Sequence, residues 1–263
     1  MKANFIVPAL ISLLVVESVV LGILVENQAK LDDLVLSASE YRSRLISMHS
    51  LDMKYFRLLQ VNVRGRTLTL PVEVSGADYM GYRDRVRQNF SIRYDLIDFR
   101  DFVTPNDPAI LAIGRALQGS FQSDLDVAEA ALDITHQMYY YSPPGGNWYM
   151  KYPVETIVEG SGLCAHLSVL VASLLEACGV DAVLIVYANP EPSQAGHMNV
   201  GVLLDSEPFP GASYVERGGK RYYVAETTNY MFSYEYSFTW DGSWKVGQMP
   251  SFLAGWETTT IEV

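Results

Sequence analysis

The chain has 263 residues, of which 49% are hydrophobic and 12% aromatic, enough for one sizeable core with an appendage. Its formal net charge of −11 argues against a nucleic-acid partner, which would need a clustered basic face. The 2 cysteines and 4 histidines give no zinc-finger spacing, and we expect neither a metal site nor a cofactor.

The first candidate element is a membrane span at Phe5–Val25, which is almost wholly apolar and about as long as a bilayer crossing requires. A cleaved signal peptide is the alternative, but its apolar core is usually about 7–15 residues and precedes a small-x-small cleavage site. The sequence Asn27-Gln28-Ala29 fits that site poorly. We therefore predict a retained anchor in residues 1–26, a single-pass membrane protein, and a folded domain on the extracytoplasmic side.

Residues 27–56 are predicted to form a helical stalk after the anchor. Leu31, Ala38 and Leu45 recur at heptad spacing, and a second row runs from Leu34 to Tyr55. About three heptads is the lower limit for a coiled coil, so the stalk is a candidate for homo-oligomer contacts. Packing of this helix against its own domain explains the pattern equally well.

Residues 57–102 change period and predict a hairpin with a linker. Leu59-Val61-Val63 alternate with polar residues, and Arg64-Gly65-Arg66 reads as the turn. Thr67–Val74 is the second strand, in which Pro71 marks an edge or a bulge. A short helix is predicted over Asp78–Asn89.

Residues 103–263 are predicted to form the main domain. Thr104 and Pro105 resemble the cap and first residue of a helix that runs to about Gln118. A second helix is expected from Ser123 to Tyr140. Further on, strands are predicted at Val180–Tyr187, His197–Leu204 and Lys220–Glu226, with loops at Asp205–Arg217 and Thr227–Trp256.

The stretch from Glu159 to Gly179 is the most informative part of this domain. A Gly160-Ser161-Gly162 turn precedes Cys164, and the following residues are apolar nearly all round a helix, which predicts a buried one ending at Gly179. Free N–H groups and the helix dipole at the first turn favour a thiolate. Cys164 is therefore either a nucleophile or, like most free cysteines, a small buried hydrophobe. Cys178 lies about 21 Å further along this helix, too far for a disulfide with Cys164.

Two further residues complete a catalytic pattern. His197 opens one predicted strand and Glu226 ends the next, so antiparallel pairing would bring the two side chains together. Glu226 could then fix the tautomer of His197 and stabilise its cation. Cys164, His197 and Glu226 are the nucleophile, base and orienting acid that covalent acyl transfer needs. His166 is a rival base, but it lies about 200° round the helix from Cys164.

The chain resembles the transglutaminase-like superfamily, above all its archaeal and bacterial members, over roughly Val103 to Thr228. The resemblance implies a papain-like α+β fold with Cys164 as nucleophile, His197 as base and Glu226 in the acidic place. Leu163 stands where the family often has an acid, and Glu226 where it often has Asp. The segments that carry the resemblance are Tyr152–Thr156 with Gly160–Cys164, Gly196–Val202 and Tyr222–Thr228.

We expect an oxyanion hole made by the Cys164 backbone N–H, and Trp148 and Tyr149 are the two candidates for its side-chain donor. No acidic cluster in the sequence resembles a calcium site. The predicted function is a membrane-anchored cysteine acyltransferase, amidase or peptidase that acts on a protein or peptide amide through a thioester. The alternative is a catalytically inactive binding or scaffold domain tethered to the membrane.

Overall fold

The computed structural model describes residues 52–85, 98–140, 149–191, 196–229 and 244–263. The predicted anchor and most of the predicted stalk lie outside these ranges, and so does Trp148. Within the residues that the structure describes, no helix combines the length and apolar character needed to cross a membrane.

A long hairpin begins the described part of the chain. Strands β1 (Lys54–Val63) and β2 (Arg66–Ser75) pair antiparallel, and Arg64 and Gly65 both take the positive φ that a two-residue turn requires. Pro71 lies opposite Leu58 in an unbroken register. Each strand of a two-stranded sheet is an edge strand, where proline is tolerated without a bulge. The hairpin prediction is therefore confirmed.

The predicted stalk helix is too long at its C-terminal end. It was expected to continue through Tyr55, but Lys54 already begins β1. Tyr55 pairs with Val74 across the hairpin, and its ring packs edge-on against Tyr79 at 5.0 Å. Tertiary pairing of this kind overrides a heptad pattern that spans only a few turns.

Three helices follow the hairpin: α2 (Gly76–Arg83), α3 (Pro108–Ser120) and α4 (Asp124–His136). The predicted start of α3 at Thr104 is wrong. The carboxylate of Asp107 caps the helix by accepting from the Ala109 N–H at 2.8 Å, and Pro108 is the first helical residue. A residue before proline avoids the helical region, so Asp107 must stay outside the helix. The predicted helix from Ser123 likewise ends early, because Tyr139–Tyr140 forms the short strand β3.

Helix α5 (Pro153–Glu159) was not predicted, although Pro153 at its first position and Glu155 at its third are good start signals. Glu155 accepts from the Tyr152 N–H at 2.9 Å. Gly160 ends the helix in the left-handed conformation, and Ser161–Gly162 then forms β4, which pairs with β3. The predicted glycine turn is therefore a helix cap followed by a short extended segment.

Helix α6 (Cys164–Ala177) is buried over all but its last two residues, as the sequence predicted. It ends at Gly179, where the Gly179 N–H donates to Glu176 and the Val180 N–H to Leu175, both at 2.9 Å. This pair of bonds is a Schellman motif, with glycine in the left-handed position that the motif favours.

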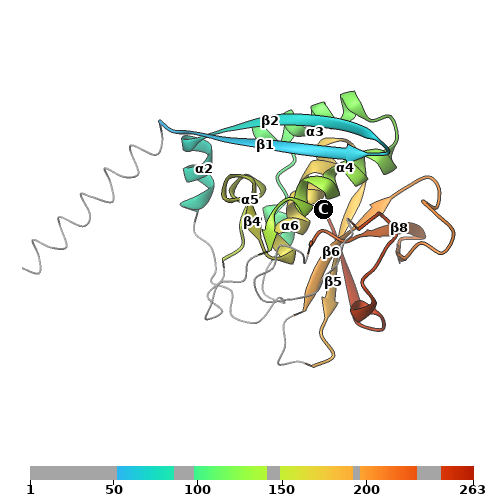
Figure 1. Ribbon diagram of the computed structural model, residues 1–263. Coiled ribbons are helices and arrows are strands. Elements are labelled where there is room, and N and C mark those ends of the chain that lie inside the picture. The colour runs from blue at the N-terminus through green and yellow to red at the C-terminus, as the bar shows by residue number, and fades with distance from the viewer. Residues whose placement is uncertain (1–51, 86–97, 141–148, 192–195, 230–243) are drawn as a thin grey trace, which may run out of the picture. The chain divides into compact units, whose positions relative to one another are not determined.

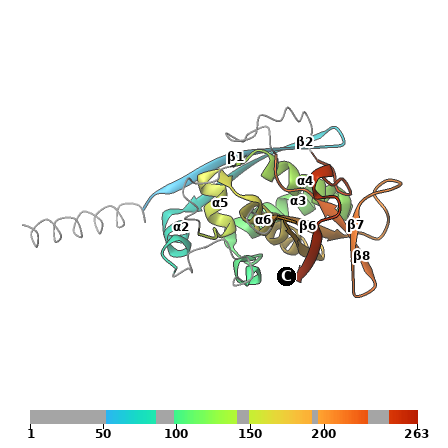
Figure 2. The ribbon, with the colours of Figure 1, turned by 90° about the horizontal axis from the view of Figure 1, so that it is seen from below.

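The helices form one layer of the domain, and the layer beside α6 is an antiparallel sheet with strand order β7-β8-β6-β5-β9. Helix α6 packs against β5 and β6, and α3 and α4 cover its other side and carry the hairpin (Figures 1 and 2). Strands β7 and β9 fall where the sequence predicted no strand. The strand bounds are β5 Ala182–Ala188, β6 His197–Leu203, β7 Tyr214–Arg217, β8 Lys220–Ala225 and β9 Glu257–Glu262.

Candidate active site

Cys164 is the first residue of α6, and only 4% of its surface is exposed to solvent. It forms no disulfide. The backbone N–H groups of the first helical turn have no partner within the helix, so this end of α6 is electrostatically positive. The sequence placed the cysteine at this position correctly.

His197 and Glu226 lie together at the end of the sheet where β6 begins and β8 finishes. The register of β6 with β8 pairs Val200 with Ala225. Continuing this antiparallel register by one residue places Asn199 opposite Glu226. His197, two residues before Asn199, is then the diagonal neighbour of Glu226. His197 Nε2 is 2.9 Å from one carboxylate oxygen and 3.1 Å from the other. The predicted antiparallel contact is present.

The Cys164 side chain also interacts with His197 and acts to raise the pKa of its imidazole. Since Nε2 faces Glu226, Nδ1 is the ring nitrogen left for the sulfur. Burial by itself lowers the pKa of His197, but the Glu226 carboxylate and the hydrogen bonds to Cys164 and Glu226 outweigh it and raise that pKa to about 10. A pKa raised in this direction favours the imidazolium form at neutral pH.

Glu226 is fully buried and its carboxylate has several donors. Thr228 donates to Oε1 through both its backbone N–H (2.9 Å) and its hydroxyl (2.6 Å), and Asn199 Nδ2 lies 3.4 Å from Oε2. Burial alone raises the pKa of Glu226, but the His197 cation and the Thr228 bonds outweigh it and lower that pKa. The acid is held as a carboxylate.

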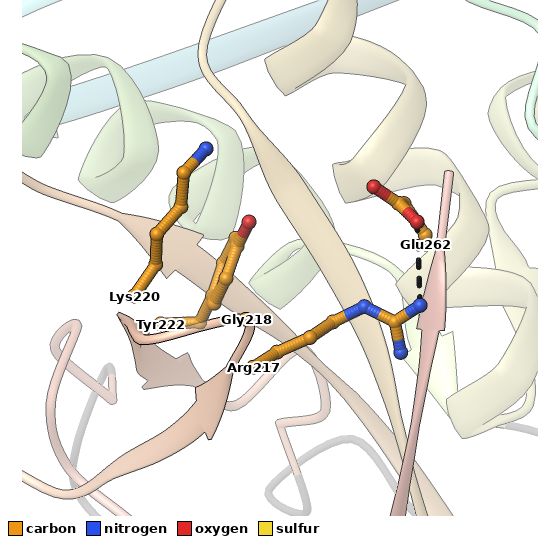
Figure 3. Close-up of a pocket in the computed structure, with 5 residues that line it drawn as sticks. All are labelled: Arg217, Gly218, Lys220, Tyr222 and Glu262. Atoms are coloured by element: carbon orange, nitrogen blue, oxygen red, sulfur yellow. Dashed lines mark hydrogen bonds and ion pairs between the residues drawn. The ribbon is translucent and has the colours of Figure 1, made fainter.

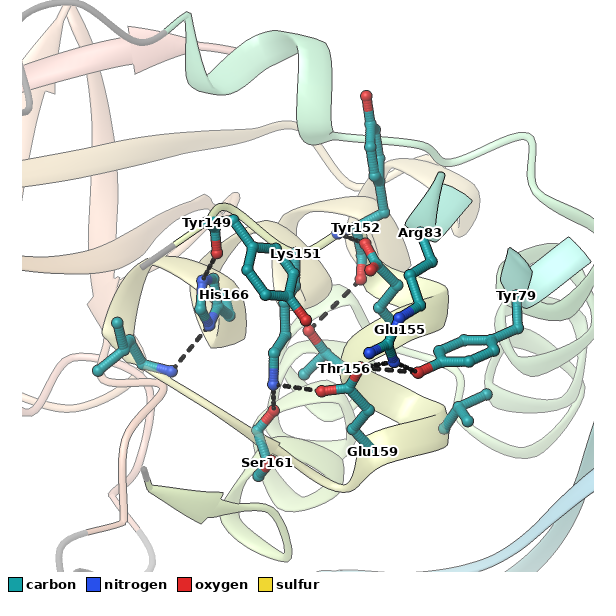
Figure 4. Close-up of polar contacts among 12 residues, drawn as sticks. Tyr79, Arg83, Tyr149, Lys151, Tyr152, Glu155, Thr156, Glu159, Ser161 and His166 are labelled. Carbon is teal, nitrogen blue, oxygen red and sulfur yellow. Dashed lines mark hydrogen bonds and ion pairs between the residues drawn. The ribbon is translucent and has the colours of Figure 1, made fainter. Parts of the chain in front are cut away.

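His166 is excluded as the base by its partners. Its Nδ1 accepts from the Leu163 N–H at 3.0 Å, which makes Nε2 the protonated nitrogen, and Nε2 donates to the Tyr149 carbonyl oxygen at 3.1 Å (Figure 4). Both ring nitrogens are thus engaged with the backbone. His166 fixes the approach to α6 and has no nitrogen free for the thiol.

The turn before Cys164 is held by ion-paired side chains. Lys151 Nζ donates to the Ser161 carbonyl oxygen at 3.0 Å and lies 2.8 Å from Glu159, whose other oxygen accepts from the Tyr79 hydroxyl at 2.9 Å (Figure 4). Tyr149 acts electrostatically on Arg83, which belongs to the same cluster. The oxyanion role assigned to Tyr149 stays a prediction, and that of Trp148 falls outside the described residues.

Several neighbours of the site were not predicted. Phe252, which is 48% exposed, approaches His197 edge-on with 5.8 Å between ring centroids, although the sequence assigned no chemistry to Thr227–Trp256. Asn199 could have been found, because alternation along a strand puts it on the same face as His197. Phe252 carries no local signal that marks it as part of a site, and Thr228 lies within the Tyr222–Thr228 segment of the resemblance but was assigned no role.

A separate cavity of about 420 Å³ lies at the opposite end of β8 (Figure 3). Its two cations already have carboxylate partners: Arg217 lies 3.3 Å from Glu262, and Lys220 lies 3.1 Å from Asp181. With its charges satisfied internally, this cavity is a weaker candidate site than the Cys164 region.

A family model described as a transglutaminase-like domain matches residues 106–209. Residues 106–209 are therefore similar to a transglutaminase-like domain. The resemblance inferred from the sequence is thereby confirmed for this range, which contains Cys164 and His197. Glu226 lies beyond the part matched as a transglutaminase-like domain, so its assignment depends on the geometry of β8.

The other comparisons add little. No curated protein matches it. Among solved structures, a candidate cysteine protease from Cytophaga hutchinsonii is 19% identical with a TM-score of 0.32. The match covers 51% of this chain and 43% of that protein, so this chain spans less than half of its length.

Proposed function

We propose that this protein is a membrane-anchored, transglutaminase-like cysteine acyltransferase or amidase that uses Cys164, His197 and Glu226. The observation that carries the proposal is the position of the His197 ring, which is hydrogen-bonded to the buried Glu226 carboxylate through Nε2 and also interacts with the Cys164 side chain. Nucleophile, base and orienting acid are then in the order that acyl transfer requires.

The resting site holds a thiolate–imidazolium pair in this proposal. Glu226 keeps His197 protonated, and the proton that His197 carries is the one that Cys164 has given up. The thiolate attacks an amide carbonyl carbon to form a tetrahedral oxyanion, which the Cys164 backbone N–H stabilises. As the C–N bond breaks, His197 protonates the leaving amine and a thioester remains on Cys164.

The second half of the reaction resolves the thioester. Neutral His197 accepts a proton from the incoming nucleophile, which attacks the thioester carbon, and the sulfur leaves again as a thiolate beside the imidazolium. Water as nucleophile gives an amidase or peptidase, and an amine gives a crosslinking acyltransferase. The same three residues serve both, and the expected substrate is a protein or peptide amide.

The membrane anchor is part of this proposal. Phe5–Val25 has the length and apolar character of a single span, and Asn27-Gln28-Ala29 makes a poor cleavage site. The domain would then act on substrates at the extracytoplasmic surface of the membrane.

One observation favours a second candidate, a non-catalytic binding domain on the same anchor. Cys164 is 4% and His197 5% exposed, so little of either side chain faces solvent. Leu163, in place of an acidic residue before the cysteine, points the same way. In this second candidate the Cys164–His197–Glu226 contacts only stabilise the fold.

Alkylation distinguishes the two candidates. The full-length chain is treated with iodoacetamide near pH 7, and the label on Cys164 is measured by peptide mass spectrometry in the wild type and in His197→Ala. We expect labelling of the variant to be at least about tenfold slower, because the variant has no imidazolium to stabilise the thiolate. A tenfold change corresponds to about 1.4 kcal/mol of lost stabilisation. Equal labelling of the two proteins would refute the enzyme proposal.

A further inference from the structure

We infer that Ser168 is a positioning residue for the proposed reaction, because its hydroxyl bonds to both of the segments that carry His197 and Glu226. The inference rests on the proposed function. It adds a residue outside the triad, one whose two hydrogen bonds tie the nucleophile helix to the segments that carry the other two members.

Ser168 lies one helical turn after Cys164, so the two side chains share a face of α6. Its Oγ donates to the Met198 carbonyl oxygen at 3.1 Å and lies 3.0 Å from the Thr227 hydroxyl. Met198 directly follows the candidate base, and Thr227 directly follows the candidate acid. The three residues of this second set of contacts therefore accompany the triad: Ser168 lies one turn after Cys164, Met198 follows His197, and Thr227 follows Glu226.

The direction of the bonds follows from the number of hydrogens. A serine hydroxyl has a single hydrogen, and that of Ser168 is given to Met198. Thr227 must therefore donate to Ser168 Oγ. Ser168 and Thr227 are both fully buried, so water is not at hand to replace either bond. The resulting chain runs from the end of β8 through α6 to the start of β6.

Directional bonds restrain α6 in a way that apolar packing does not. The contact between Cys164 and His197 depends on how far α6 is displaced along its own axis relative to β6, and hydrophobic burial changes little with such sliding. A displacement of about 1 Å at a reacting group can cost about a hundredfold in rate. Ser168 resists that displacement one turn away from the sulfur.

The same helix offers a matched control in Ser173. It is also fully buried, and its Oγ bonds to the Val169 carbonyl oxygen at 2.7 Å and to the Thr104 N–H at 2.9 Å. Neither partner belongs to the strands that carry His197 and Glu226. Ser173→Ala removes an equally buried hydroxyl from α6 without loosening the active-site end.

The experiment measures the rate of Cys164 alkylation by iodoacetamide from pH 5.5 to 10 in the full-length chain. The variants are Ser168→Ala, Ser173→Ala and His197→Ala, with Thr227→Val as a second way to break the same chain of bonds. We expect Ser168→Ala and Thr227→Val to slow labelling near pH 7 by about three- to tenfold, with little change at pH 10, where a cysteine ionises without help. Ser173→Ala should follow the wild-type profile of labelling rate against pH, even if its melting temperature falls as far as that of Ser168→Ala.

The outcomes separate this inference from the proposed function. A His197→Ala profile that matches the wild type would overturn both. If His197→Ala shifts the profile while Ser168→Ala and Thr227→Val do not, the triad stands and the role of Ser168 is refuted. An equal shift in Ser173→Ala would also refute it, since the effect would then come from general loosening of the helix.

Discussion

The His136 ring on α4 lies 2.9 Å from the backbone carbonyl oxygen of Glu226, measured from Nε2. Glu226 therefore contacts two histidines, His197 through its carboxylate and His136 through its main chain. His136 is buried, so this contact is part of the packed interior. Its bond anchors the main chain at the end of β8 to α4.

This contact predicts a loss of stability in mild acid. Burial lowers the pKa of His136 below its ordinary value of about 6.5, so the folded protein keeps the ring neutral where the unfolded chain would protonate it. Its contribution is complete above about pH 6.5 and is lost as the pH falls from there towards the folded pKa. Urea titrations of wild type and His136→Gln should show a shallower fall between about pH 6.5 and 5 in the variant. Parallel curves would contradict this assignment.

The ion pair of His197 and Glu226 has the opposite dependence at alkaline pH. The His197 pKa is raised to about 10, so its stabilisation is complete below the unfolded pKa of about 6.5 and is lost as the pH rises towards 10. Glu226→Gln should destabilise the fold by about 3 kcal/mol at pH 6.5, the usual order for removing one partner of a buried pair. The difference between wild type and variant should shrink by pH 10, and a difference that stays constant in urea titrations would count against the pair.

The two cysteines should differ strongly in reactivity. Burial raises the pKa of Cys178 to about 11, and its sulfur lies 3.4 Å from the Gly114 carbonyl oxygen. We expect native protein at pH 8 to be labelled at Cys164 alone, and unfolded protein at both residues. Preferential labelling of Cys178 in the native state would show that the activated thiol has been misassigned.

The anchor proposal predicts a change of fraction on truncation. Deleting residues 1–26 should move the chain from the membrane fraction to the soluble fraction after cell lysis and ultracentrifugation. Replacing Glu17 with Leu in the full-length chain is the control, because it leaves the apolar stretch in place and should keep the protein in the membrane. An unchanged distribution after the deletion would mean that another part of the chain holds the protein there.

The cysteine helix and the two strands of the site were predictable because local patterns agree with the tertiary structure. Apolar residues surround α6 and Gly179 stops it, so only a buried helix fits that stretch. The alternation after His197 and the run that ends at Glu226 each predict one strand and one candidate site residue. Antiparallel neighbours were then enough to bring the histidine and the acid together.

Other elements depend on contacts that a local pattern does not contain. Strand β9 reads Glu257–Glu262 with mostly exposed side chains, and only its pairing along β5 makes it a strand. The start of α3 depended on the choice between Thr104 and Asp107 as the cap, which the position of Pro108 decides. Phe252 reaches His197 from far along the chain, through a tertiary contact alone.

The charge on His197 is the central claim of this account, and nitrogen NMR of ¹⁵N-histidine-labelled full-length protein measures it directly. His197→Gln identifies the signal, and Glu226→Gln removes the carboxylate that is held responsible for the charge. We predict that both ring nitrogens of His197 are protonated at pH 8 in the wild type and that the ring is neutral in Glu226→Gln. A neutral His197 tautomer in the wild type at pH 8 would contradict the imidazolium that the proposed chemistry requires.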